Sequence, residues 1–195
     1  SQALIKGHSV KTVDCHEGEK TAVYLHGGGT TGKSKTIMLS GANINAIADK
    51  LEPLDIPDLK PGKECSLVVL PMFHAFGLAV AMHYPLTHGY TLLPMPQFSA
   101  ESANKLMRKH NITFILGVPN MFFRGYGLTE VGSVCTANCY GAVREESIGR
   151  PLKGMTVEIW DDMKNRLPAG QNGEIVVKGS TVMQGYFSGD NTVMN

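Results

Sequence analysis

The chain has 195 residues, of which 43% are hydrophobic and 18% are charged, and its formal net charge is +1. This composition excludes a disordered chain, and the near-neutral charge excludes an electrostatic nucleic-acid-binding surface. The apolar runs at 66–70 and 77–82 are far shorter than the roughly 20 residues of a membrane-spanning helix, so we expect no span.

The N-terminal residues 1–10 lack the charged-then-apolar design of a secretion signal. The four cysteines, at positions 15, 65, 135 and 139, form no CxxC pair. Cys135 and Cys139 could supply half a metal site, but no second pair stands nearby. We therefore predict a reduced, cytoplasmic protein without structural zinc.

A glycine-rich loop is expected after a short strand at 21–25. Glycine lets backbone N–H groups converge on an anion, while hydroxyl and ammonium groups add donors and charge. The residues that we predict to bind phosphate are Gly29, Thr30, Thr31, Gly32, Lys33, Ser34 and Lys35. A plain surface loop is the alternative, which so many glycines, threonines and lysines after a strand disfavour.

The same loop satisfies a second pattern. The spacing Gly27-x-x-x-x-Gly32-Lys33-Ser34 matches that of P-loop NTPases. That class also needs an apolar strand ending in a magnesium-binding Asp, and the nearest candidate, 157–161, lies in a region that predicts a hairpin. The P-loop interpretation is thus kept as an alternative.

Further along the chain, helical and strand patterns alternate. Apolar residues at 44, 47, 48 and 51 predict a helix that Pro53 ends. Continuous apolar runs at 66–70 and 112–118, with a further strand at 90–93, predict buried strands, and helices are expected at 77–84 and 100–110. Ser99 is the predicted N-cap of the last helix, and its predicted inner face is Ala103, Leu106, Met107 and His110. Together these elements predict an α/β fold with a mostly parallel sheet.

One histidine follows the first of the buried strands. His74 stands in the segment Pro-Met-Phe-His-Ala-Phe-Gly, directly beyond the strand at 66–70. Ligands of open α/β sheets bind beyond the carboxyl ends of the strands, so His74 is a candidate site residue. A histidine tucked under a loop is the alternative.

The pattern changes after residue 148. Short strand-like runs at Thr156–Trp160 and Glu174–Lys178 flank a turn rich in Asn, Pro and Gly, which is typical of an antiparallel hairpin. We predict an α/β portion at 1–148 and a small antiparallel β subdomain at 149–195.

A second motif, Gly-Tyr-Gly-Leu-Thr-Glu, occupies residues 125–130. Tyr126 beside Gly127 offers a flat face for a base, Thr129 offers a hydroxyl to a phosphate oxygen, and Glu130 offers an oxygen ligand to Mg²⁺. These groups complement a phosphate loop.

Five motifs now stand in a fixed order: the glycine-rich loop, 71–77, 125–130, the Gly-Arg-Pro at 149–151, and 173–179 with 185–187. In this order the chain resembles the adenylate-forming superfamily, which includes the acyl-CoA synthetases, over residues 20–190. The resemblance implies an enzyme in which a carboxylate attacks Mg·ATP to give acyl-AMP and pyrophosphate, and a thiol such as coenzyme A then takes the acyl group.

The resemblance also implies roles for residues. Those on the β- and γ-phosphates would be Thr30, Thr31, Gly32 and Lys35. Thr129 would lie at the α-phosphate, Glu130 on magnesium and Tyr126 against adenine, while His74 would border the acyl pocket. His74, where amino-acid-activating domains tend to have Asp, favours a simple carboxylic or fatty acid. An acyl-AMP ligase serving an acyl carrier protein and an inactive nucleotide-binding fragment stay open.

The chain departs from the family pattern in places. Ser34 replaces the usual proline, and Gly28 replaces a serine. A segment of the family is absent between Phe123 and Arg124, where a parallel crossover needs about a dozen residues, so we expect that a stretch is missing at this junction. Asn195 precedes the C-terminal domain that would carry the adenylation lysine.

Overall fold

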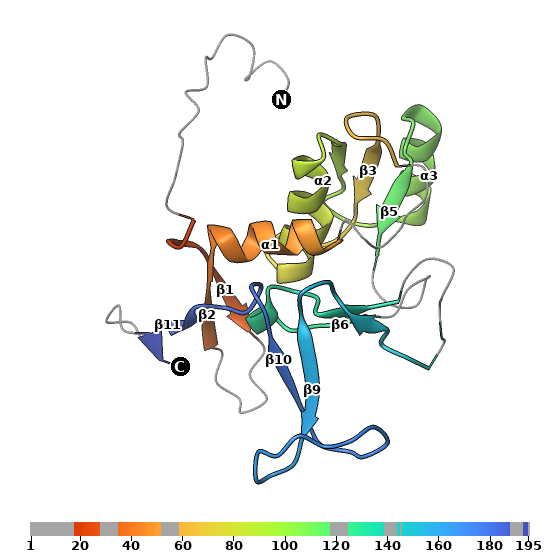
Figure 1. The fold of residues 1–195 in the computed structure, drawn as a ribbon. Helices are drawn as coiled ribbons and strands as arrows, with labels where there is room; N and C mark the ends of the chain where they lie inside the picture. Colours follow the sequence, from red (N-terminus) through yellow and green to blue (C-terminus); the bar gives the residue numbers. More distant parts are fainter. Residues whose placement is uncertain are drawn as a thin grey trace.

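A computed structural model describes residues 18–27, 35–51, 59–117, 125–138, 144, 146–187 and 193–194. The described residues form the predicted α/β fold, with one parallel sheet and several antiparallel ones. Helix α1 (Gly41–Leu51) lies between two layers (Figure 1). One contains the antiparallel strands β1 (Thr21–Gly27) and β2 (Lys35–Ser40), and the other contains α2 (Tyr84–Thr87) and β3 (Cys65–Val68). Most of the predicted phosphate loop, residues 28–34, and the junction at Phe123–Arg124 lie outside the described residues.

The parallel sheet has the apolar run at 66–70 at its centre. Its strand order is β4-β3-β5, with both neighbours parallel to β3, and Leu67 stands opposite Leu93 and Ile115. Leu67 is fully buried, as the unbroken apolar run requires. The strands are β3 (Cys65–Val68), β4 (Thr91–Pro94) and β5 (Phe114–Leu116), and the helices between them are η3 (Phe76–His83), α2 (Tyr84–Thr87) and α3 (Ala100–Lys109). The predicted parallel βαβ arrangement is therefore confirmed.

The helix after β3 is wider than the predicted α-helix. η3 is a π-helix, in which the N–H of Tyr84 donates to the carbonyl of Ala79, five residues earlier. A Cβ added at Gly77 would collide with the carbonyl of Pro71, so the segment that carries His74 turns tightly into this helix. Short π-helical stretches are frequent at functional sites.

Helix α3 begins where its N-cap was predicted. The Ser99 hydroxyl accepts a hydrogen bond from the Ser102 N–H at 3.1 Å. Ala103 is buried and Leu106 packs beside it, but Met107 is 41% exposed. The prediction that Met107 faces inward was wrong, because the hydrophobic cluster around Leu67 includes Ala103 and Leu106 of this helix but not Met107.

We expect Ser99→Ala to lower the free energy of unfolding by about 1 kcal/mol, because it leaves the Ser102 N–H without its cap. Urea denaturation followed by circular dichroism measures this change. Ser99→Asp retains an acceptor and is the matched control. Equal stability of the Ala and Asp variants would contradict the capping role.

The glycine-rich loop lies between two antiparallel strands. β1 (Thr21–Gly27) pairs with β2 (Lys35–Ser40), and Gly27 stands opposite Lys35. β2 was not predicted from the sequence, although its residues Ile37 and Leu39 are fully buried. A P-loop requires a helix directly after the loop, so the hairpin disfavours the P-loop alternative.

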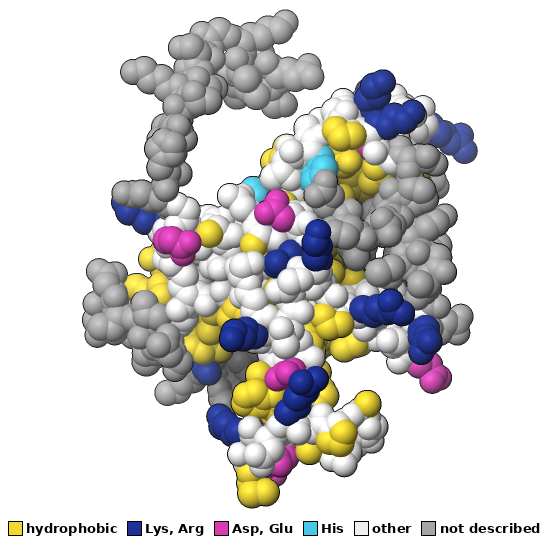
Figure 2. Space-filling view, in the orientation of Figure 1, with side chains coloured by type: hydrophobic (Ala, Val, Ile, Leu, Met, Phe, Trp, Pro, Cys, Tyr) yellow, Lys and Arg dark blue, Asp and Glu magenta, His cyan; other side chains and the backbone are white. Residues whose placement is uncertain are grey.

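The C-terminal residues contribute to more than one sheet. β9 (Thr156–Trp160) and β10 (Glu174–Lys178) form the predicted antiparallel hairpin, which projects from the molecule in Figure 1 and in Figure 2. A separate three-stranded sheet has the order β6-β7-β8. β11 and β12 extend the β1–β2 sheet beyond β2. These strands are β6 (Gly125–Tyr126), β7 (Thr136–Ala137), β8 (Arg150–Pro151), β11 (Gly185–Phe187) and β12 (Val193–Met194). The boundary at 148/149 stays a prediction.

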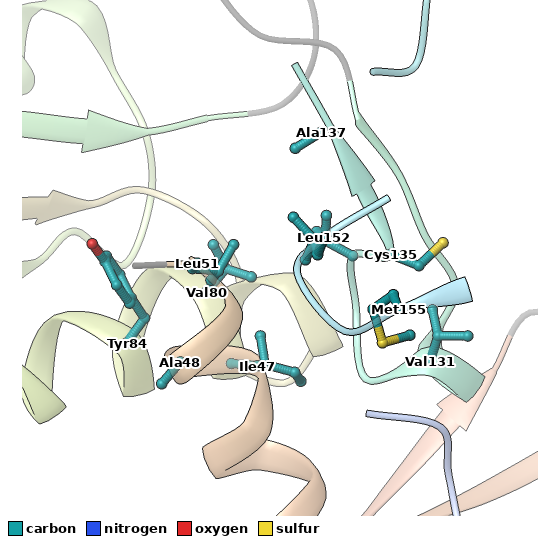
Figure 3. Close-up of a cluster of buried hydrophobic side chains, with 12 residues drawn as sticks. Ile47, Ala48, Leu51, Val80, Tyr84, Val131, Cys135, Ala137, Leu152 and Met155 are labelled. Atoms are coloured by element: carbon teal, nitrogen blue, oxygen red, sulfur yellow. The ribbon is translucent and has the colours of Figure 1, made fainter. Parts of the chain in front are cut away.

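The largest hydrophobic cluster joins α1 and η3 to the segment after the Gly-Tyr-Gly-Leu-Thr-Glu motif. Figure 3 shows Ile47 and Leu51 of α1 and Val80 of η3 facing the side chains of Leu152 and Met155. Val131, Cys135 and Ala137 complete that opposite wall. Burial of this apolar surface therefore fixes the motif against the helical layer.

A histidine lies at the contact of η3 with α1. His83 Nε2 is 2.9 Å from Asn45 Oδ1, and burial lowers the pKa of His83 below its ordinary value of 6.5. The unfolded chain therefore takes up this proton first as the pH falls through 6.5, and the folded state loses stability there.

We expect His83→Gln to reduce the fall in melting temperature between about pH 7.5 and about pH 5.5. Differential scanning calorimetry at the two pH values measures it. His26→Gln, which removes an exposed imidazole of β1, is the control. An unchanged fall in the His83 variant would contradict the assignment.

Candidate functional site

A cleft of about 380 Å³ opens where β1, β5 and the loop after β3 meet the segment 125–134. This volume is within the range of small-molecule sites. The lining residues are Gly27, His74, Ala75, Phe76, Gly117, Gly125, Tyr126, Gly127, Leu128, Thr129, Glu130, Ser133 and Val134. The cleft thus brings together five predicted site residues from two distant segments: His74, Tyr126, Gly127, Thr129 and Glu130.

His74 enters the cleft from the loop beyond β3, as predicted from the sequence. Its neighbour Ala75 is 2% exposed and packs against Leu25 and Ile37 of the β1–β2 sheet. The His74 Nδ1 accepts the Phe76 N–H at 3.3 Å. This bond orients the ring and leaves Nε2 as the nitrogen that could contact a ligand in the cleft.

The segment 125–134 folds back on itself along the cleft. A Cβ added at Gly127 would collide with the carbonyl of Ser133, so only glycine fits there. The Tyr126 carbonyl accepts the Cys135 N–H at 2.9 Å. The Tyr126 N–H donates to Thr136 Oγ1 at 3.2 Å. The backbone beside the Tyr126 ring is therefore held on both sides.

Thr129 and Glu130 lie in one short helical turn, η4 (Thr129–Val131). The Leu128 carbonyl accepts the N–H groups of Val131 and Ser133, which closes this turn. The Glu130 carbonyl accepts the Met183 N–H at 2.7 Å, and Glu130 Oε1 accepts the Tyr186 hydroxyl at 3.1 Å. Residues before and within β11 thus hold both the backbone and the side chain of Glu130.

Lys35 does not line the cleft. It is the first residue of β2, and its ammonium lies 4.5 Å from the centroid of the Tyr186 ring. The other predicted phosphate-binding residues, Gly29, Thr30, Thr31, Gly32, Lys33 and Ser34, lie outside the described residues. The loop that contains them leaves β1 at Gly27, where an added Cβ would stand 3.7 Å from Glu130 Oε1. Both ends of the loop therefore lie near Glu130, one directly and one through Tyr186.

Two features of the site were missed in the sequence analysis. Ser133 lines the cleft with φ 135°, a strained backbone angle that brings its carbonyl against Gly127. Tyr186 belongs to the Gly-Tyr-Phe motif at 185–187, but no function of Tyr186 was predicted from the sequence. The only sequence signal for Tyr186 was that motif, because its partner Glu130 is 56 positions away.

The cleft contains one carboxylate that could bind a divalent cation, that of Glu130. Among the described residues there is no group of three or more His, Cys, Asp or Glu side chains that could form an all-protein metal site. Mg²⁺ is commonly bound by one or two carboxylates with substrate phosphates. Glu130 in the cleft meets that requirement.

The two motifs that carry the resemblance to the adenylate-forming enzymes, the Gly-Tyr-Gly-Leu-Thr-Glu segment and the segment with His74, meet in one cleft of an α/β fold. A family model for the AMP-binding enzyme matches residues 5–124 and 122–187. The chain belongs to this family, and the predicted resemblance is confirmed.

Among named relatives, the long-chain-fatty-acid–CoA ligase of Bacillus subtilis (strain 168) is 28% identical over 212 residues. This match covers 86% of the chain and 38% of that ligase. The 2-succinylbenzoate–CoA ligase of Bacillus cereus (strain Q1) is 27% identical over 87% of the chain and 43% of its own length. The chain thus spans less than half the length of these relatives.

Solved structures share the fold. O-succinylbenzoate coenzyme A synthetase from Bacillus subtilis, in complex with AMP, has a TM-score of 0.76 at 24% identity and matches over 88% of this chain and 54% of its own. ATP-bound MatB from Rhodopseudomonas palustris has a TM-score of 0.79 at 24% identity, over 94% and 44% of the two chains. In the described residues, no helix is both long and apolar enough to cross a bilayer.

Proposed function

We propose that this chain is the AMP-binding portion of an acid–thiol ligase, which activates a carboxylic acid with ATP to acyl-AMP, releases pyrophosphate and passes the acyl group to coenzyme A. The observation that carries this proposal is the cleft that gathers His74, Tyr126, Thr129 and Glu130. Family membership and the CoA-ligase names of the relatives support it.

The proposed roles follow the positions of the side chains. Gly127 permits close approach of a nucleotide to the backbone beside the Tyr126 ring, which would lie against adenine. Thr129 would donate to the α-phosphate, and Glu130 would hold Mg²⁺, which neutralises charge on the phosphates when bound. The loop 29–35 would take the β- and γ-phosphates.

His74, which lines the same cleft, would border the reacting carboxylate. Its ring is already oriented through Nδ1, so Nε2 would donate to a carboxylate oxygen of the acid and align it for attack on the α-phosphate. Apolar Phe76 and Leu128 line the same cleft and suit the first carbons of an acyl chain.

A fatty acid is the proposed substrate class. The relatives named as long-chain-fatty-acid–CoA ligases support it, whereas those named for 2-succinylbenzoate favour an aromatic acid. Coenzyme A is the proposed acceptor in preference to a carrier protein, and the proposed location is the cytoplasm.

The domain limits at 148/149 and the missing stretch at Phe123–Arg124 also stay proposals. The alignment with the fatty-acid ligase runs over 212 residues but includes only 86% of this 195-residue chain, so the relative has residues without a counterpart here. This difference supports a missing segment.

Exchange of labelled pyrophosphate into ATP tests the proposed function. We expect exchange that depends on Mg²⁺ and on one class in a panel of short, medium, long-chain and aromatic acids. Isothermal titration calorimetry (ITC) with ATP, run in parallel, detects nucleotide binding without turnover. Nucleotide binding without exchange would favour the non-catalytic fragment, whereas release of ADP without acid would contradict the ligase assignment.

A further inference from the structure

Tyr186 connects three parts of the site. Its backbone pairs with Ile37 of β2, and its ring packs in the cluster that contains Leu25 and Ile37. Its hydroxyl donates to Glu130 Oε1 at 3.1 Å. Because the strand pairing and the ring packing are both fixed, the hydroxyl is held in place by groups other than Glu130.

The hydrogen bond engages one oxygen of the Glu130 carboxylate. A carboxylate has two acceptor oxygens, so a donor on Oε1 leaves Oε2 and the remaining lone pairs available to another partner. The Met183 N–H on the Glu130 carbonyl fixes the backbone of the same residue. Glu130 thus faces the cleft in a defined orientation before any ligand binds.

A tyrosine hydroxyl donates a hydrogen bond without adding a positive charge. The ammonium of Lys35 lies over the ring of Tyr186 rather than on the carboxylate. Neither of these two contacts of Tyr186 therefore places a cation on the Glu130 carboxylate.

We propose that Tyr186 is a positioning residue that holds the Glu130 carboxylate in the orientation that binds the divalent cation of Mg·ATP, and so sets the Mg²⁺ affinity of the site. The inference rests on the proposed function, because it needs Glu130 to face a metal–nucleotide complex. Removing a residue that hydrogen-bonds to a metal ligand typically lowers the metal affinity by about 10- to 100-fold.

Tyr186→Phe tests this role because it removes only the hydroxyl and keeps the ring under Lys35. Binding of ATP to the 195-residue chain is measured by ITC over a series of MgCl₂ concentrations and again in excess EDTA. We expect the half-saturating Mg²⁺ concentration to rise about 10-fold, with ATP binding in EDTA and the melting temperature unchanged. Tyr24→Phe is the matched control: Tyr24 is 53% exposed on β1, and its ring contacts Phe187 outside the cleft.

Each outcome decides the inference. An unchanged Mg²⁺ dependence in Tyr186→Phe overturns it, and so does an equal loss of binding with and without Mg²⁺, which would indicate a merely structural contact. If the unaltered chain binds ATP but Tyr186→Phe leaves its Mg²⁺ dependence intact, the proposed function survives and only the inference fails. If the unaltered chain binds no ATP, both fail.

Discussion

Replacing Glu130 with Gln is expected to weaken the binding of Mg·ATP by about 100-fold or more, because the change removes the charge that would coordinate the metal. The amide oxygen still accepts the Tyr186 hydroxyl, and the backbone bond from Met183 is unaffected. We therefore expect the melting temperature of the nucleotide-free chain to stay within a few degrees of the unaltered protein. ITC with MgCl₂ and with EDTA measures the first effect, and calorimetry measures the second.

The matched control is Glu158→Gln. Glu158 lies on β9, where its carboxylate accepts the Trp160 indole N–H at 3.0 Å and pairs with Arg166 at 3.2 Å, outside the cleft. This control should leave Mg·ATP binding unchanged. A Glu130 variant that loses stability as much as it loses binding, or loses ATP equally in EDTA, would refute the metal-binding role.

The second large effect is expected from Gly127→Ala. The new methyl group would collide with the Ser133 carbonyl, and the surrounding segment cannot move aside because Val131, Val134 and Cys135 are buried in the main core cluster. We expect a loss of about 3 kcal/mol or more in the free energy of unfolding, as for other substitutions that overpack a fixed backbone. Urea denaturation measures the loss, and ITC tests whether Mg·ATP binding falls with it.

Gly41→Ala is the control for the loss of a glycine. Gly41 begins α1, and the nearest atom to an added Cβ is 3.5 Å away, which is an ordinary contact. Alanine there should be neutral or stabilise by up to roughly 1 kcal/mol, because it reduces the freedom of the unfolded chain. Equal stability of the two variants would show that the close approach at Gly127 does not constrain the segment.

The Glu130 and Gly127 variants test two different properties of the site, its charge and its shape. Glu130→Gln changes a charge and keeps the shape of the cleft, while Gly127→Ala changes the shape and keeps every charge. Since Tyr186 contacts Glu130 and not Gly127, Tyr186→Phe should resemble Glu130→Gln, with a smaller loss of Mg·ATP binding. If Tyr186→Phe instead loses stability as Gly127→Ala does, Tyr186 has only a structural role.

Much of the architecture could be predicted from the sequence because its signals are local. The apolar run around Leu67 predicts a strand buried on both faces, Ser99 caps its helix through a bond three residues away, and the hairpin of β9 and β10 forms at the predicted residues. The order of the five motifs predicted the family, which the family model confirms. All of these signals are carried by neighbouring residues or by spacing along the chain.

Other features were decided only by the tertiary structure. β2 forms after the glycine-rich loop because β1 and β11 pair with its two edges, and the π-helix at Phe76–His83 accompanies the tight turn at Gly77, which packs against Pro71. Met107 is exposed because the cluster around Leu67 includes Ala103 and Leu106 of α3 but not Met107. Tyr186 reaches Glu130 only because β11 pairs with β2, and a contact between residues 56 positions apart has no periodic or local signal in the sequence.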